Sequence, residues 1–363
     1  MANLRRVLAA AAGAVDRAAV AAMQAHGARG RARAESMSHG ERLAALGEIA
    51  AAYPEELIAR PELFFEPPPA ITPTLTPVRE MRAPRATVED AAWPSEYRPY
   101  LAELTDRWGA FGENRVARAR LFRRDGEGRP AIVAVHGYLG GQWLIEESQW
   151  PLARWLWSGL DVALPLLPFH GRRASPRRGA PPFPGADPRM NVEGFRQAVS
   201  DIRALVRYLR ARGAPHVGVV GVSLGGYTSS LLATVAPEID FVMPMIPLAS
   251  VADFARDRGS LGSGAAADAQ HAALERAHRV VSPLARPLLL PPSRALVVAA
   301  VQDGITPARH AARIRDHFGC AELSLAGGHI VQLDRRAAFR ALGEMLAREG
   351  VISRSSRRRA PRP

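Results

Sequence analysis

The stretch VVGVSLGGYTSSLL, residues 219–232, places Ser223 midway between Gly221 and Gly225. This spacing is typical of a serine nucleophile on a sharp turn, but it also arises by chance. The surrounding sequence therefore has to distinguish a nucleophile from a structural serine. The apolar run HVGVVGV at 216–222 predicts a buried strand directly before the serine, and the residues after it predict a helix. A strand, a turn and a helix in this order make the serine hydroxyl project from a sheet, with small residues needed two positions away on each side. We therefore predict that Ser223 is a nucleophile rather than a structural turn serine.

Short apolar runs and helical patterns alternate along the chain from about residue 93. The runs lie at 131–137, 161–171, 216–223, 241–247, 295–303 and 322–329, and an alternating run at 116–122 predicts an edge strand. Amphipathic patterns between them predict helices at 142–157, 191–213, 224–236, 307–318 and 335–350. Together they predict an α/β fold with a mostly parallel sheet and helices on both faces. In such a sheet, ligands bind at the carboxyl ends of the strands.

A serine hydroxyl is a weak nucleophile at neutral pH, so it needs a base, and the base needs an orienting acid. Asp303 ends one buried run, and His329 follows the last run after two glycines. The order Ser223, Asp303, His329 is the chain order that this architecture imposes, and we predict these three as the catalytic residues. Asp253, which follows the preceding run, is an alternative acid.

The negative oxygen of a tetrahedral intermediate needs two backbone N–H donors. The amide of Leu224, at the start of the helix after the serine, is one predicted donor. The other is expected in the turn HGYLGG at 136–141, with Tyr138 as first choice and Leu139 as second. His136 comes too early in the chain for the base and is expected to be structural.

The HG turn, the glycine-flanked Ser223, Asp303 and the late His329 together resemble the α/β-hydrolase superfamily over roughly residues 93–350. The stretches LPLLPFHGRR (164–173) and NVEGFRQAVSDIRALVRYLRARG (191–213) resemble the abhydrolase-domain 18-like group, and more distantly the acetyl-xylan-esterase and dienelactone-hydrolase branches. The resemblance implies hydrolysis of an ester, thioester, amide or similar bond without choosing among them.

Five regions are expected along the chain. They are an N-terminal helical extension at 1–66, a proline-rich connector at 67–92, an α/β-hydrolase domain at 93–350, a helical cap insertion within it at about 248–294, and a basic disordered tail at 351–363. Ser38 is the expected cap of a helix in the extension. Because the connector separates the extension from every proposed catalytic residue, we predict that residues 1 to about 80 are dispensable for chemistry.

All 48 basic residues are arginine and the net charge is +13. We attribute this excess of arginine to a general bias in composition and not to a binding function. No zinc-finger spacing or aromatic RNA-binding string accompanies the charge, so no specific nucleic-acid partner is expected, and peripheral contact with an anionic membrane is kept as an alternative. A single cysteine excludes an internal disulfide framework and a cysteine-based zinc site. We predict neither a cofactor nor a metal ion.

The first residues resemble a signal peptide, with Arg5 and Arg6 before an alanine-rich run, but Asp16 interrupts the run early. A cytoplasmic protein is therefore expected, with export as the alternative. The chain has no run of 18 uninterrupted apolar residues that would predict a spanning helix.

The segment HGRRASPRRG, residues 170–179, leaves a predicted strand on the same sheet edge as Ser223. Arginine binds carboxylate and phosphate in a bidentate manner, which predicts a substrate with an anionic group; the alternative is a solvated loop. The predicted substrate-binding residues are His170, Arg172 and Arg173, with Arg177 and Arg178 further along the same segment.

The function predicted overall is a serine hydrolase that cleaves a small-molecule or lipid-like carboxylic ester. The alternatives are a catalytically silent scaffold that binds a partner, a thioesterase, a lipase and a small-peptide hydrolase. Oligomeric state is not predicted.

Overall fold

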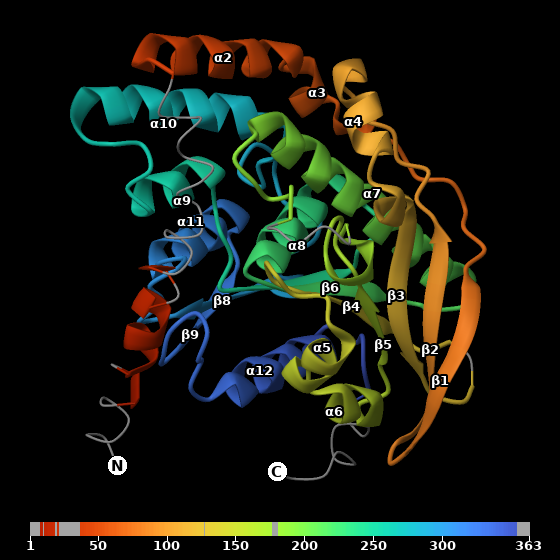
Figure 1. Cartoon of the computed structure of the whole chain (residues 1–363). Coiled ribbons are helices and arrows are strands. Elements are labelled where there is room, and N and C mark those ends of the chain that lie inside the picture. Colours follow the sequence, from red (N-terminus) through yellow and green to blue (C-terminus); the bar gives the residue numbers. More distant parts are fainter. Residues whose placement is uncertain are drawn as a thin grey trace.

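The computed structural model describes residues 8–9, 11–18, 20–21, 37–126, 128–175 and 181–353. Figure 1 shows a twisted central sheet with helices on both faces. The strands are β1 (Thr74–Arg82), β2 (Arg85–Pro94), β3 (Val116–Arg123), β4 (Ala131–Val135), β5 (Asp161–Pro165), β6 (Val217–Val222), β7 (Phe241–Met245), β8 (Leu296–Ala300) and β9 (Ala321–Leu325). Their order across the sheet is β1-β2-β3-β5-β4-β6-β7-β8-β9. The neighbours from β5 to β9 pair in parallel, so the predicted mostly parallel α/β sheet is confirmed.

The central strands are buried along their whole length, because helices cover both faces of the sheet. In β4, Val133 and Val135 pack into one apolar layer, while Ile132 and Ala134 pack into the other. Successive side chains of a strand point to opposite faces, so a strand covered on both sides has to be apolar throughout. This is why these segments appear in the sequence as continuous apolar runs.

The helices form two layers around the sheet (Figure 1). One layer contains α7 (Pro188–Ala211), α8 (Leu224–Val235) and α11 (Ala308–Phe318), and the opposite layer contains α5 (Trp143–Gln149), α6 (Leu152–Trp157) and α12 (Arg335–Arg348). Further helices in the described residues are α2 (His39–Ala52), α3 (Glu56–Ala59), α4 (Thr105–Gly109), α9 (Val251–Asp257) and α10 (Gly264–His278). None of the helices in the described residues is both long enough and apolar enough to cross a membrane.

The predicted connector at 67–92 is largely part of the sheet, which corrects the sequence-based boundary. β1 and β2 pair as an antiparallel hairpin, and β2 pairs with β3, so β3 lies inside the sheet and is not the edge strand that we predicted. Proline is tolerated in the outermost strand, where its missing N–H costs no ladder hydrogen bond. Pro77 lies in that strand, β1, next to an irregularity in the register.

Helix α2, in the predicted N-terminal extension, packs against α10, in the predicted cap insertion. Ser38 caps α2 as predicted, and Glu41 completes the reciprocal capping box. Figure 1 shows α2 lying along α10, and the side chains of His39 and Gln270 are 3.0 Å apart. The guanidinium of Arg286, which follows α10 in the chain, donates to the carbonyl oxygen of Ile58. Residues before the hairpin therefore contribute to the surface that covers the sheet.

Candidate active site

Ser223 lies between β6 and α8 in a backbone conformation that side chains rarely adopt, with φ 57° and ψ −112°. The two flanking glycines make this turn possible. A Cβ atom at Gly221 would lie 1.9 Å from the carbonyl oxygen of Gly225, and a Cβ at Gly225 would lie 2.3 Å from that of Val135. Any larger residue would push strand and helix apart, so the small residues are required by the close crossing of the backbone.

His329 lies between Ser223 and Asp303 and contacts both. Its Nε2 is 2.8 Å from the Ser223 Oγ, and its Nδ1 is 2.8 Å from the Asp303 Oδ2. A carboxylate can only accept, so Asp303 places the imidazole proton on Nδ1 and leaves Nε2 free to accept the serine proton. The structure thus brings together the three residues predicted from chain order, in the arrangement that serine activation requires.

The carboxyl group of Asp303 is held by backbone donors. Its side chain has no exposed surface, and its Oδ1 accepts from the amides of Ile305 (2.8 Å) and Thr306 (2.7 Å). The Thr306 hydroxyl lies 3.0 Å from His329 Nδ1 and donates to the carbonyl of Ile246 at 3.0 Å. Thr306 is not among the residues predicted from the sequence, although its position three residues after the acid is typical of a turn around a carboxylate.

The turn predicted to supply an oxyanion donor lies directly against the serine. A Cβ atom at Gly137 would be 3.5 Å from the Ser223 Cβ, so the next residue, Tyr138, is close to the nucleophile. Leu139 has φ 61° and is 63% exposed. Leu224 is the first residue of α8, where amides have no partner within the helix. The amides of Tyr138 and Leu224 thus both belong to segments that flank Ser223.

Two buried side chains support this turn. His136 donates from Nδ1 to the Gly137 carbonyl at 2.7 Å and accepts at Nε2 from the Leu167 amide at 3.0 Å, as its expected structural role requires. Glu146 accepts from the Gly141 amide at 2.8 Å, and burial raises the pKa of its carboxyl group. The contact between His136 and Leu167 could not be read from the sequence, because Leu167 follows a different strand, β5.

The predicted substrate-binding arginines do not all face solvent, and Arg173 corrects the sequence-based assignment. Its side chain is fully buried and donates to the Leu166 and Asn114 carbonyls, each at 3.0 Å, while it forms an ion pair with Asp201 at 2.8 Å. Because its side chain is fully buried and paired with Asp201, Arg173 is not an exposed guanidinium that could bind an anionic substrate from solvent. Arg172 is exposed, whereas Arg177 and Arg178 lie outside the described residues.

His170 is also buried, with its Nδ1 donating to the Pro168 carbonyl at 2.8 Å. Its ring packs edge-on against the ring of Tyr138, with centroids 5.9 Å apart. A contact between His170 and a substrate therefore stays a prediction, whereas its packing against the Tyr138 turn is observed.

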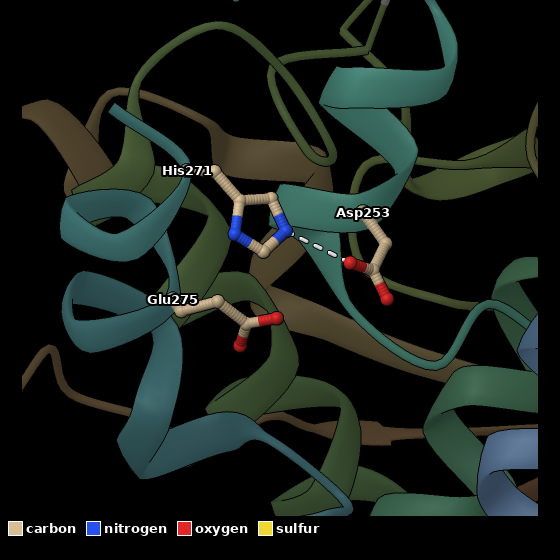
Figure 2. Close-up of side chains that lie close together, drawn as sticks. All are labelled: Asp253, His271 and Glu275. Atoms are coloured by element: carbon tan, nitrogen blue, oxygen red, sulfur yellow. Dashed lines mark hydrogen bonds and ion pairs between the residues drawn. The ribbon is translucent and has the colours of Figure 1, made fainter. Parts of the chain in front are cut away.

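Figure 2 shows Asp253, the alternative acid, beside His271. It accepts from His271 Nε2 at 2.8 Å and pairs with the Arg313 guanidinium. Burial raises the pKa of the Asp253 carboxyl, but the hydrogen bond from His271 and the Arg313 charge outweigh it and hold the pKa below its usual value. Figure 2 also shows Glu275 beside His271, and in the described residues these three side chains bring their potential ligand atoms within 4.8 Å of one another. Because the Arg313 charge already balances Asp253, a metal ion is not needed to explain this cluster.

Because several histidines are buried, we expect the free energy of unfolding to decrease at acidic pH. Burial lowers the pKa of His170 to about 4, from 6.5, so the folded protein keeps this ring neutral while the unfolded chain protonates it. The unfolded state then binds more protons below pH 6.5, and the free energy of unfolding decreases as the pH falls from 6.5 towards 4. We expect the decrease between pH 7 and pH 5, measured by urea unfolding, to be about 2 kcal/mol smaller in His170→Gln than in the unaltered protein. The same pH dependence in both proteins would contradict a neutral buried His170.

No family model matches the chain. Two uncharacterized proteins of Mycobacterium tuberculosis, from strains CDC 1551 / Oshkosh and H37Rv, are each 28% identical over 302 residues, which cover 81% of this chain and 72% of theirs. Among solved structures, acetyl xylan esterase 1 from Thermoanaerobacterium sp. JW/SL YS485 superposes with a TM-score of 0.54 at 16% identity, covering 80% of this chain and 93% of that one. The acetyl xylan esterase from Paenibacillus sp. R4 superposes with a TM-score of 0.56 at 14% identity, covering 82% and 98%. At these identities the likeness concerns the fold, and it shows that the chain has an α/β-hydrolase fold.

Proposed function

We propose that this protein is a serine hydrolase that cleaves carboxylic esters through an acyl-enzyme. The observation that carries the proposal is the continuous chain of contacts from Ser223 Oγ through His329 to the buried Asp303, each 2.8 Å long. A surface serine with a structural role has no need of a strained backbone or of a histidine held in one tautomer by a buried acid. The names of two neighbours in fold, both acetyl xylan esterases, support an ester as the scissile group.

In the first half of the reaction, the Ser223 Oγ attacks the ester carbonyl carbon while His329 Nε2 takes the hydroxyl proton. The carbonyl oxygen becomes negative and is bound by the backbone amides of Leu224 and Tyr138. Asp303 stabilises the imidazolium without taking its proton. When the carbonyl re-forms, the alcohol leaves with the proton from Nε2, and the acyl group stays on the serine.

In the second half, a water molecule attacks the acyl carbon while His329 Nε2 takes one of its protons. The same two amides bind the second tetrahedral intermediate. Its collapse breaks the bond to Ser223 Oγ, which recovers the proton, and the carboxylic acid is released.

Leu139 and Ile330, which are 63% and 52% exposed, adjoin the oxyanion turn and the base, so the proposed substrate has apolar groups near the reacting carbonyl. The proposed substrate has no anionic group bound by Arg173, because that guanidinium is buried and paired with Asp201.

A fluorophosphonate probe tests this proposal. Such a probe phosphonylates a serine only where a base activates it, so we expect one adduct per chain, mapped by mass spectrometry to Ser223. Ser230→Ala is the matched control: Ser230 lies on α8, the helix that follows Ser223, and its hydroxyl donates to the Gly226 carbonyl, so this variant should label normally. Hydrolysis of p-nitrophenyl acetate by the same sample separates an esterase from a silent scaffold. Absence of the adduct, or an adduct on another residue, would overturn the proposal.

A further inference from the structure

One carboxylate from the N-terminal helix reaches the loops that carry the proposed acid and base. Asp16 belongs to the helical residues 11–18, and the residue has no exposed surface. Its Oδ2 accepts from the backbone amides of Gly304, at 3.0 Å, and His329, at 2.5 Å. Its Oδ1 accepts from the amide of Ile330 at 3.0 Å. The carboxylate therefore joins the loop after β8 to the loop after β9.

The glycines of these loops leave room for this contact. A Cβ atom at Gly328 would lie 2.4 Å from the Asp16 Oδ2 and 3.0 Å from the carbonyl oxygen of Ala12. A Cβ at Gly304 would lie 3.1 Å from the Asp16 Cβ. Gly328, before His329, and Gly304, after Asp303, thus leave space where the N-terminal helix approaches. This fit indicates that the helix packs specifically against the two loops.

The loop after β8 is held from a second direction by Arg258, the residue after α9. Its guanidinium donates to the carbonyl oxygens of Gly304 at 2.6 Å and Ile305 at 2.7 Å. Asp16 and Arg258 therefore bind the amide and the carbonyl of the same residue, Gly304, which directly follows Asp303. The N-terminal helix and the cap insertion both restrain the acid, but of these two side chains Asp16 alone also binds the loop of the base.

We propose that Asp16 is a positioning residue that holds the His329 loop and the Asp303 loop in register, so that the N-terminal helix is part of the catalytic unit. This inference rests on the proposed serine hydrolase function. All three partners of the carboxylate are N–H donors, and charge-assisted bonds of this kind are short and directional. Catalysis depends on sub-ångström placement of the base relative to the serine, so loss of the carboxylate acts through His329 without touching substrate. The proposal implies that residue 16 is needed for full activity, contrary to the sequence-based prediction that residues 1 to about 80 are dispensable.

The test compares Asp16→Asn, Asp16→Glu and the control Arg17→Ala, which alters an exposed residue of the same helix. An amide in place of the carboxylate turns an NH₂ group towards N–H donors, so we expect kcat for p-nitrophenyl acetate to fall about 100-fold in Asp16→Asn with KM changed less than threefold. Asp16→Glu keeps the charge and should retain clearly more of kcat, and Arg17→Ala should match the unaltered enzyme. A merely structural role would instead lower the melting temperature and leave kcat per folded molecule intact, and that result overturns the proposal.

The rates of hydrogen exchange at the amides of Gly304, His329 and Ile330 give a second readout. They depend neither on turnover nor on the melting temperature of the variant. We expect these amides to exchange faster in Asp16→Asn, while amides of β6 stay protected. Unchanged exchange would overturn the inference. If the unaltered protein neither hydrolyses esters nor takes the fluorophosphonate label, the proposed function fails; if it does both and Asp16→Asn has normal kcat, the inference about Asp16 fails alone.

Discussion

Replacing Ser223 by alanine is expected to lower kcat for a short-chain p-nitrophenyl ester by roughly 10⁵-fold or more, because the variant has no atom that can form the acyl-enzyme. The fold should persist. Alanine and serine meet the same backbone strain at φ 57°, and the close crossing of β6 and α8 depends on Gly221 and Gly225, which the variant keeps. Kinetics with purified protein, together with circular dichroism, measure the two effects separately.

Ser230→Ala supplies the control for this experiment, since it removes a buried hydroxyl from the same helix without touching His329. Its kcat should stay within a few-fold of the unaltered enzyme. Activity of Ser223→Ala within tenfold of the unaltered protein would remove Ser223 from the mechanism and with it the proposed acyl-enzyme.

Asp303→Asn is expected to lower kcat by about 10⁴-fold with little change in KM. The Asp303 Oδ1 accepts from the Ile305 and Thr306 amides, so an asparagine keeps its carbonyl oxygen there and turns its NH₂ group towards His329. The imidazole must then accept at Nδ1 and carry its proton on Nε2, where it can no longer take the serine proton. Steady-state kinetics over a range of pH measure the loss.

Asp253→Asn is the matched comparison, because Asp253 also follows a central strand but binds His271 of α10 and Arg313 of α11. We expect its kcat to stay within about tenfold of the unaltered enzyme, since its carboxylate binds His271 and Arg313, whereas His329 binds Asp303. Greater damage from Asp253→Asn than from Asp303→Asn would place the acid on the earlier strand and contradict the assignment made here.

The sequence by itself predicted the central sheet, its helices and the three residues that meet at its edge. Each of these depends on local information. A strand buried on both faces must be apolar throughout, as β4 and β6 are, and a turn with the backbone of Ser223 needs glycines at 221 and 225. Asp303 and His329 follow strands, and the carboxyl ends of parallel strands share one edge, so chain order was enough to bring them near Ser223.

Only the tertiary structure decided which surfaces the remaining segments cover and which partners the charged side chains take. The proline-rich segment around Pro77 looks like a linker by composition, yet it pairs at the outer edge of the sheet, where proline costs nothing. Arg173 looks like an anion-binding side chain until Asp201, 28 positions along the chain, is seen to neutralise it in the interior. Asp16 interrupts an alanine-rich helix, and nothing near it in sequence indicates the three amides that it binds. Local periodicity indicates that a segment is buried, but its partners depend on long-range packing. Such packing brings Asp16 beside His329.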